Sequence, residues 1–197
     1  MNKLPLYKAS INVFDDEYFT GIYTISLVDM PAVESDFVAF GKPNEVKMRV
    51  ENEEKRIITG VVMRCDYPIY RNDGGYEYYV TFDADTIKQI TQKWFKTGLN
   101  TNVNIMHTCE YVSGVDMQQA FIKDTEKGLN PVGFEDIADG SLFVTYKVNN
   151  DEVWQAIKKG EFKGFSLEGY LNYDKVESDE DKLIDEISEI IKQIANK

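Results

Sequence analysis

The sequence predicts an α+β fold with about seven strands and two helices. Short runs rich in β-branched and aromatic residues recur along the chain, separated by residues that favour turns. In two other segments, apolar residues recur at helical spacing behind a residue able to cap a helix. We expect a β-rich N-terminal arm (residues 1–45), a central domain (46–175), and an acidic linker with an amphipathic C-terminal helix (176–197).

The expected arm consists of strands and loops. Strand-forming runs cover residues 6–13, 21–28 and 37–40. Pro31 disfavours helical backbone in the residue before it. The arm is therefore not expected to be helical.

The central domain is expected to begin with strands and a helix. A strand over 56–63 is followed by a hairpin whose limbs meet at the turn residues 72–75. Asp83 is suited to cap a helix over 84–97, and a second, shorter helix is expected over 152–159.

Later strands carry the polar residues of interest. His107 follows a strand over 103–106, and Ser166 lies in a strand over 164–170. On the strand 114–122, alternation places Gln119 on one face with three apolar side chains. These are Val115, Met117 and Phe121. One further strand is expected over 142–148.

The tail has its own pattern. Residues 178–181 match a capping box, and four apolar residues then recur at 4, 3, 4 spacing, as in a short heptad seam. They are Leu183, Ile187, Ile190 and Ile194. Such a helix either packs on its own domain or mediates self-association, and the sequence leaves both interpretations open.

The acidic composition argues against two classes of binding partner. The chain has 22 basic and 34 acidic residues, a net charge of −12. Nucleic acids and anionic membranes are bound through clustered Lys and Arg, so we expect neither as a partner. The sequence shows no signal peptide and no apolar run long enough to span a bilayer, so we expect a cytoplasmic protein.

Cofactors are not expected either. Cys65 and Cys109 do not make a disulfide framework, and with a single histidine they are too few for a four-ligand zinc site. No calcium-loop motif of alternating aspartates occurs. We therefore predict no metal and no other cofactor.

One pair is suited to acid–base chemistry at neutral pH. His107 is the only histidine, and a serine nucleophile needs such a base. Ser166 lies between Gly164 and Gly169, where missing side chains would admit a substrate backbone and free amides for an oxyanion hole. Each residue also has an ordinary structural interpretation, as a small side chain in a packed strand and as a hydrogen-bonded histidine at a strand end.

A third group should hold the imidazole Nδ1 proton. The candidates are Gln119, Glu168, Glu110 and Asp116. By alternation Glu168 shares the face of Ser166, although an acid so placed can instead form a hydrogen bond across the sheet.

A thiol hydrolase is a rival hypothesis. Cys109 lies two residues after His107, so their side chains can share a face. No glycine context suited to an oxyanion hole surrounds Cys109.

The chain resembles the XkdF-type phage prohead serine proteases, which cleave scaffold and capsid proteins during head assembly. The similar segments begin with Thr20-Gly-Ile-Tyr-Thr-Ile-Ser-Leu-Val-Asp-Met-Pro-Ala-Val-Glu34 and Phe37-Val-Ala-Phe40. They continue with Gly60-Val-Val-Met, Pro68-Ile-Tyr-Arg71 and Tyr78-Tyr-Val-Thr-Phe82. They end with Val153-Trp154, Lys159-Gly160-Glu161 and Lys163-Gly-Phe-Ser-Leu-Glu-Gly169.

The resemblance implies a serine endopeptidase with Ser166 as nucleophile and His107 as base. It also implies an antiparallel β-barrel core wrapped by a few helices, similar to herpesvirus assemblins. Scaffold and major capsid proteins would be the partners, inside the procapsid in the host cytoplasm. Members of this family tend to carry glutamate where Gln119 stands, so a weak or inactive, structural head protein is the alternative.

Overall fold

The computed structural model describes residues 4–14, 20–30, 49–52, 55–177 and 187, and it confirms the α+β class. The helices are α1 (Ala84–Lys96), α2 (Asp151–Lys159) and the 3₁₀ turn η2 (Leu99–Thr101). The strands are β1 (Leu6–Ser10), β2 (Gly21–Val28), β3 (Arg49–Asn52), β4 (Ile57–Met63), β5 (Ile69–Asp73), β6 (Tyr76–Thr81), β7 (Val103–Ile105), β8 (Val115–Ile122), β9 (Leu142–Val148), β10 (Gly164–Tyr170) and β11 (Asn172–Lys175).

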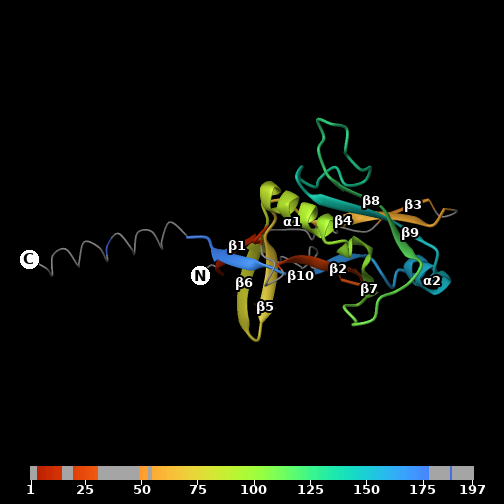
Figure 1. Ribbon diagram of the computed structural model, residues 1–197, viewed down its shortest axis with the longest axis horizontal. Helices are drawn as coiled ribbons and strands as arrows, with labels where there is room; N and C mark the ends of the chain where they lie inside the picture. Colours follow the sequence, from red (N-terminus) through yellow and green to blue (C-terminus); the bar gives the residue numbers. More distant parts are fainter. Residues whose placement is uncertain (1–3, 15–19, 31–48, 53–54, 178–186, 188–197) are drawn as a thin grey trace, which may run out of the picture.

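The strands form three sheets. Their orders are β11-β1-β6-β5, β10-β2-β7 and β3-β4-β9-β8. In the three-stranded sheet, β2 is central, antiparallel to β10 and parallel to β7. No closed barrel is found among the described residues, so the expected barrel core remains a prediction. In Figure 1, the hairpin β5–β6 and helix α2 lie at opposite ends of the body.

The described part of the arm is built into these sheets. β1 pairs with β11 and β6, and β2 pairs with β10 and β7. The two described strands of the arm therefore share their hydrogen bonds with strands of the expected central domain, and β2 occupies the middle of a sheet.

The core lies between the three-stranded sheet and the sheet β3-β4-β9-β8. Ile25, Leu27 and Phe165 are buried, and the Phe165 ring lies 5.5 Å from that of the buried Tyr146 on β9. Burying apolar side chains of this size stabilises the fold by about 1.5–3 kcal/mol each. One face of the β10-β2-β7 sheet is thereby fixed as its core face.

Helix α1 begins and ends as its sequence predicts. The Asp83 carboxylate accepts the Thr86 N–H at 2.7 Å, which satisfies one of the free amides of the first turn. Ile90 and Trp94 on one side of the helix are fully buried. Gly98 follows the helix at φ 71°, in the left-handed region that glycine tolerates best.

The prediction for the strand 114–122 is wrong at one point. Met117 pairs with Tyr146, but Gln119 pairs with Thr145, so Gln118 is an extra residue in a β-bulge. Tyr146 and Thr145 are adjacent in β9 and point to opposite faces. Because cross-strand partners share a face, Met117 and Gln119 do not.

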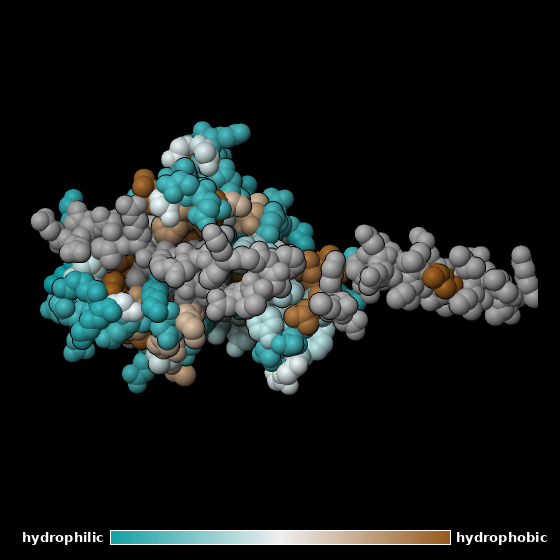
Figure 2. Space-filling model, turned by 180° about the vertical axis from the view of Figure 1, so that it is seen from behind, coloured by the Kyte–Doolittle hydropathy of each residue, from teal (hydrophilic) through white to brown (hydrophobic). Residues whose placement is uncertain are grey.

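Other predictions lie outside the described residues. They include the strand 37–40 and nearly all of the C-terminal helix, for which only residue 187 is described. Among the described helices, none has the length and apolar character needed to span a bilayer. Figure 2 shows that the described residues on one face of the molecule are mainly hydrophilic, with apolar residues in separate small spots.

Candidate active site

The face of the β10-β2-β7 sheet opposite the core is polar. Ser26 on β2 stands opposite Ser166 on β10 and opposite Asn104 on β7. Directly opposed residues in a sheet point to the same side, with Cβ atoms about 5 Å apart in an antiparallel pair. Glu168 lies two residues beyond Ser166, so it shares this side as well. The sheet therefore collects two serines, an amide and a carboxyl group from three strands.

His107 reaches the same face because of a turn. If β7 continued in alternation, His107 would follow Val103 and Ile105 toward the core. Instead, Met106 and His107 have φ values of 51° and 57°, the pattern of a type I′ turn. The Thr108 N–H closes the turn on the Ile105 carbonyl at 3.0 Å. Such backbone is costly for residues other than glycine and is concentrated at functional sites.

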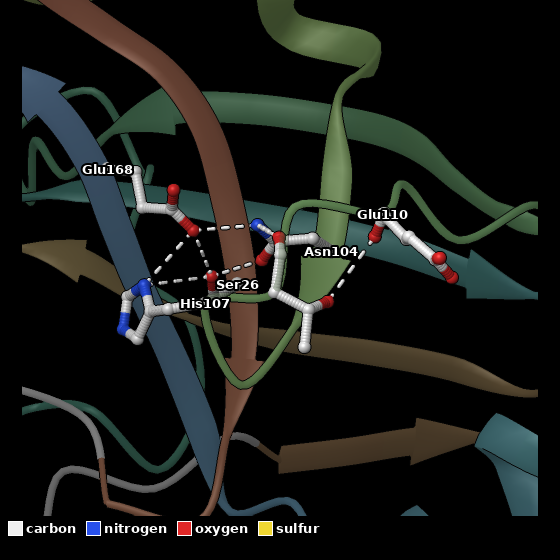
Figure 3. A network of polar contacts seen from close by, with 6 residues as sticks. Ser26, Asn104, His107, Glu110 and Glu168 are labelled. Atoms are coloured by element: carbon white, nitrogen blue, oxygen red, sulfur yellow. Dashed lines mark hydrogen bonds and ion pairs between the residues drawn. The ribbon is translucent and has the colours of Figure 1, made fainter.

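The imidazole meets the carboxylate. His107 Nδ1 lies 3.0 Å from Glu168 Oε1 and 3.1 Å from the Ser26 hydroxyl (Figure 3). The other ring nitrogen, Nε2, is on the side of the ring away from these contacts. An Nδ1–H held by a carboxylate, with Nε2 left as the base, is the arrangement that serine hydrolases use. The His107 side chain is 46% exposed and that of Glu168 is 18% exposed, so the ring is open to solvent.

Glu168 is held as an anion by its neighbours. Burial is the largest single influence on its pKa and raises it, but hydrogen bonds from Asn104, Ser26 and His107 together outweigh burial, and the pKa is lowered. A carboxylate that stays ionised at neutral pH can stabilise an imidazolium beside it.

Ser166 is on this face but does not contact His107. Its hydroxyl forms no hydrogen bond with any described residue, and the residue is 7% exposed. It stands opposite Ser26, which does contact the imidazole, so Ser166 lies on the same side of the sheet as the ring. Before substrate binds, hydrogen bonds between nucleophile and base are often long or poorly aligned.

Gly169 was expected to make room for a substrate, but the structure shows that it makes room for strand β2. A Cβ on Gly169 would lie 2.3 Å from the carbonyl oxygen of Gly21 on β2. The β10–β2 register also shifts between Glu168 and Gly169. Gly169 thus admits the backbone of the neighbouring strand, and not that of a substrate.

Two of the other sequence candidates lie elsewhere. Gln119 is exposed and lines a pocket of about 630 Å³ with Phe95 and Phe121, away from the three-stranded sheet. Asp116 accepts a hydrogen bond from Asn149. Neither Gln119 nor Asp116 has a described contact with His107.

The remaining two candidates lie near His107 in sequence but not in contact with it. The carboxylate of Glu110 points away from His107 in Figure 3. Cys109 is exposed and forms no hydrogen bond with the ring among the described residues. Glu168 is therefore the only one of the proposed third members that the structure brings to the imidazole.

Two residues of the site were missed by sequence reasoning. Ser26 is fully buried and Asn104 is 2% exposed, yet both are polar. Each is a polar residue between apolar neighbours in a strand, which was a usable signal. Their juxtaposition depends on the parallel β2–β7 pairing, which the sequence alone does not provide.

Tyrosines border the site, and we call Tyr23, Tyr111 and Tyr170 the tyrosine border. The rings of Tyr23 and Tyr170 are 5.6 Å apart, and Tyr111 forms a β-bridge with Asn104. Burial, followed by the charge of Glu168, raises the pKa of Tyr23. Tyr111 and Tyr170 are 60% and 66% exposed. An aromatic surface therefore adjoins the polar cluster.

A histidine with a carboxylate on its Nδ1, on a sheet face that also carries a serine, has the residue types of a serine hydrolase site. The family comparison agrees with this class. Residues 45–177 match the family described as "Putative phage serine protease XkdF", and the chain belongs to this family. His107, Ser166 and Glu168 lie within the matched residues, whereas Ser26 lies before them. No curated protein and no solved structure matches the chain.

Proposed function

We propose that this protein is a serine endopeptidase of phage head maturation, with Ser166 as nucleophile, His107 as base and Glu168 as the residue that orients the base. It would cleave scaffold and major capsid proteins inside the procapsid, in the host cytoplasm. The observation that supports this most is the 3.0 Å contact between His107 Nδ1 and Glu168 on the face that carries Ser166. The family gives the reaction class.

In the proposed reaction, Ser166 Oγ forms a bond to the scissile carbonyl carbon while His107 Nε2 takes the hydroxyl proton. The carbon–nitrogen bond then breaks, and Nε2 returns the proton to the leaving amine. Water repeats the sequence on the acyl-serine and releases the second product. Throughout, Glu168 stays ionised on Nδ1, which its lowered pKa favours.

Substrate would approach from the open side of the imidazole. The tyrosine border is suited to hold apolar side chains of an extended peptide beside Ser166, because aromatic rings offer large contact areas at small conformational cost. The border does not define a sequence preference by itself.

Cleavage of the cognate scaffold protein tests the function directly. We expect the purified protein to cut it, and Ser166→Ala to remove this activity. A matched control is Ser113→Ala, because Ser113 is an exposed serine outside the site. Equal cleavage by the wild type and the Ser166 variant would reject the assignment.

A covalent probe separates the two serines of the site. A fluorophosphonate loses fluoride as an activated serine oxygen bonds to its phosphorus, and mass spectrometry then locates the adduct. We expect the adduct on Ser166, because Ser26 is fully buried. An adduct on Ser26 would mean that Ser26, and not Ser166, is the nucleophile. A protein that is not labelled but still assembles into heads would favour the architectural alternative.

A further inference from the structure

We propose that Asn104 is a positioning residue that ties the turn carrying His107 to the carboxylate of Glu168, with Ser26 completing the connection. Its significance for catalysis rests on the proposed function, whereas its effect on the imidazole does not. Asn104 and Ser26 face each other across the β2–β7 pair and are almost completely buried. Polar side chains in such places are costly unless they are hydrogen-bonded.

The Asn104 amide nitrogen connects two parts of the site. Nδ2 donates to Glu168 Oε1 at 2.7 Å and to the Thr108 carbonyl at 2.7 Å. Both partners are acceptors, so the amide orientation is determined by its hydrogen bonds. Thr108 directly follows His107 and closes its turn. One NH₂ group thus joins the base-bearing turn to the carboxylate.

The proton count of the cluster is consistent with this role. The Ser26 hydroxyl has one proton and two acceptors, Asn104 Oδ1 and Glu168 Oε1. If Ser26 donated to Glu168, Oε1 would have three donors, one more than its two lone pairs accept. If Ser26 donates to Asn104 Oδ1 instead, Oε1 accepts from Asn104 Nδ2 and His107 Nδ1 only. Asn104 therefore leaves one acceptor site of Oε1 for the imidazole.

Loss of the Asn104 amide should weaken the positioning of both His107 and Glu168. Glu168 would lose a donor that helps to keep it ionised. The turn with two left-handed residues would lose the hydrogen bond from Asn104 to the Thr108 carbonyl. Misplacement of a catalytic group by about 1 Å can cost about 10²-fold in rate. Ser26 should matter less, because Asn104 and His107 still bind the carboxylate without it.

The single histidine makes the test direct. In protein labelled with ¹⁵N-histidine, all imidazole signals belong to His107. The wild type should show an Nδ1–H proton in a hydrogen bond to a carboxylate, and Nε2 unprotonated, at a pH where the ring is neutral. Asn104→Leu, which has a similar shape and no polar group, should broaden or remove the Nδ1–H signal. Asn104→Asp, which keeps Oδ1 but loses both donors, serves if the leucine variant does not fold.

The control is Thr24→Val, which removes another buried hydroxyl from β2, one without any hydrogen-bond partner among the described residues. It should keep the Nδ1–H signal, and folding of each variant is checked by the dispersion of its amide spectrum. In cleavage assays, Asn104→Leu should lower kcat about 10²-fold with little change in KM, and Ser26→Ala about tenfold. An unchanged Nδ1–H signal in folded Asn104→Leu overturns the proposal. If the wild type cleaves nothing, the proposed function fails, but the spectra still decide the role of Asn104.

Discussion

Strands β10 and β8 each carry a residue that the sequence offers as partner for His107, and only one of them reaches it. On β10, alternation is regular from Ser166 to Glu168, and the register shifts only after Glu168. On β8, the bulge comes before Gln119 and moves it to the face of Thr145. The difference shows that alternation predicts a shared face only up to the first irregularity of the strand.

The largest effect that follows from this comparison concerns these two residues. Glu168→Gln should lower kcat for scaffold cleavage by up to about 10⁴-fold, because an amide does not balance an imidazolium and favours the wrong tautomer. Gln119→Glu, the reverse exchange on β8, should leave kcat unchanged, since Gln119 is exposed and has no described contact with His107. Steady-state kinetics on the cognate scaffold measure both.

The same pair of variants can break the comparison. A gain of activity in Gln119→Glu would mean that β8 supplies a carboxylate to the site in the active state. Equal activity of Glu168→Gln and the wild type would mean that catalysis does not require a carboxylate beside His107. Thermal unfolding of both variants provides the control for folding.

Local signals predicted much of the fold. The cap at Asp83, the turn residues before Tyr76 and the left-handed stop at Gly98 all act within a few residues. The third member could also be inferred in part, because Glu168 follows Ser166 by two residues on one strand. These are interactions whose partners are close in the sequence.

The features that the sequence did not predict depend on pairings between segments far apart in the chain. Ser26 and Asn104 are 78 residues apart, and only the parallel β2–β7 register brings them together. No glycine or proline lies near Gln118 in its strand, so the sequence gives no signal for the bulge. His107 was expected at a strand end, but the two positive φ values that turn it away from the core are uncommon for residues other than glycine. Tertiary contacts select these features.

Gly169 lies where β10 packs closely against β2, at the bulge of the site sheet. Gly169→Ala should lower the free energy of unfolding by about 3 kcal/mol, because the new Cβ meets the Gly21 carbonyl, which is backbone and has little freedom to move. It should also lower kcat, since β10 carries Ser166 and Glu168. Chemical denaturation and cleavage assays measure the two effects.

A glycine outside the site sheet is the matched control. Gly128 has φ 76°, and a Cβ added to it would have no neighbouring atom within 4 Å, so Gly128→Ala costs only its backbone conformation, about 1 kcal/mol. It should leave kcat unchanged. Equal losses of stability and activity in the two variants would mean that close packing at Gly169 does not hold the site together.

The smallest expected effect concerns the tyrosine border. Tyr170→Ala should raise KM for a peptide substrate about three- to tenfold and leave kcat nearly unchanged, because an aromatic contact contributes about 0.5–1.5 kcal/mol. Tyr76 on β6 is the matched control, since it is 54% exposed and its ring lies 5.6 Å from that of Tyr78, as the Tyr170 ring does from Tyr23. Tyr76→Ala should change neither constant. A fall in kcat alone for Tyr170→Ala would instead indicate that this end of β10 positions Glu168, because uniform substrate binding affects KM and not kcat.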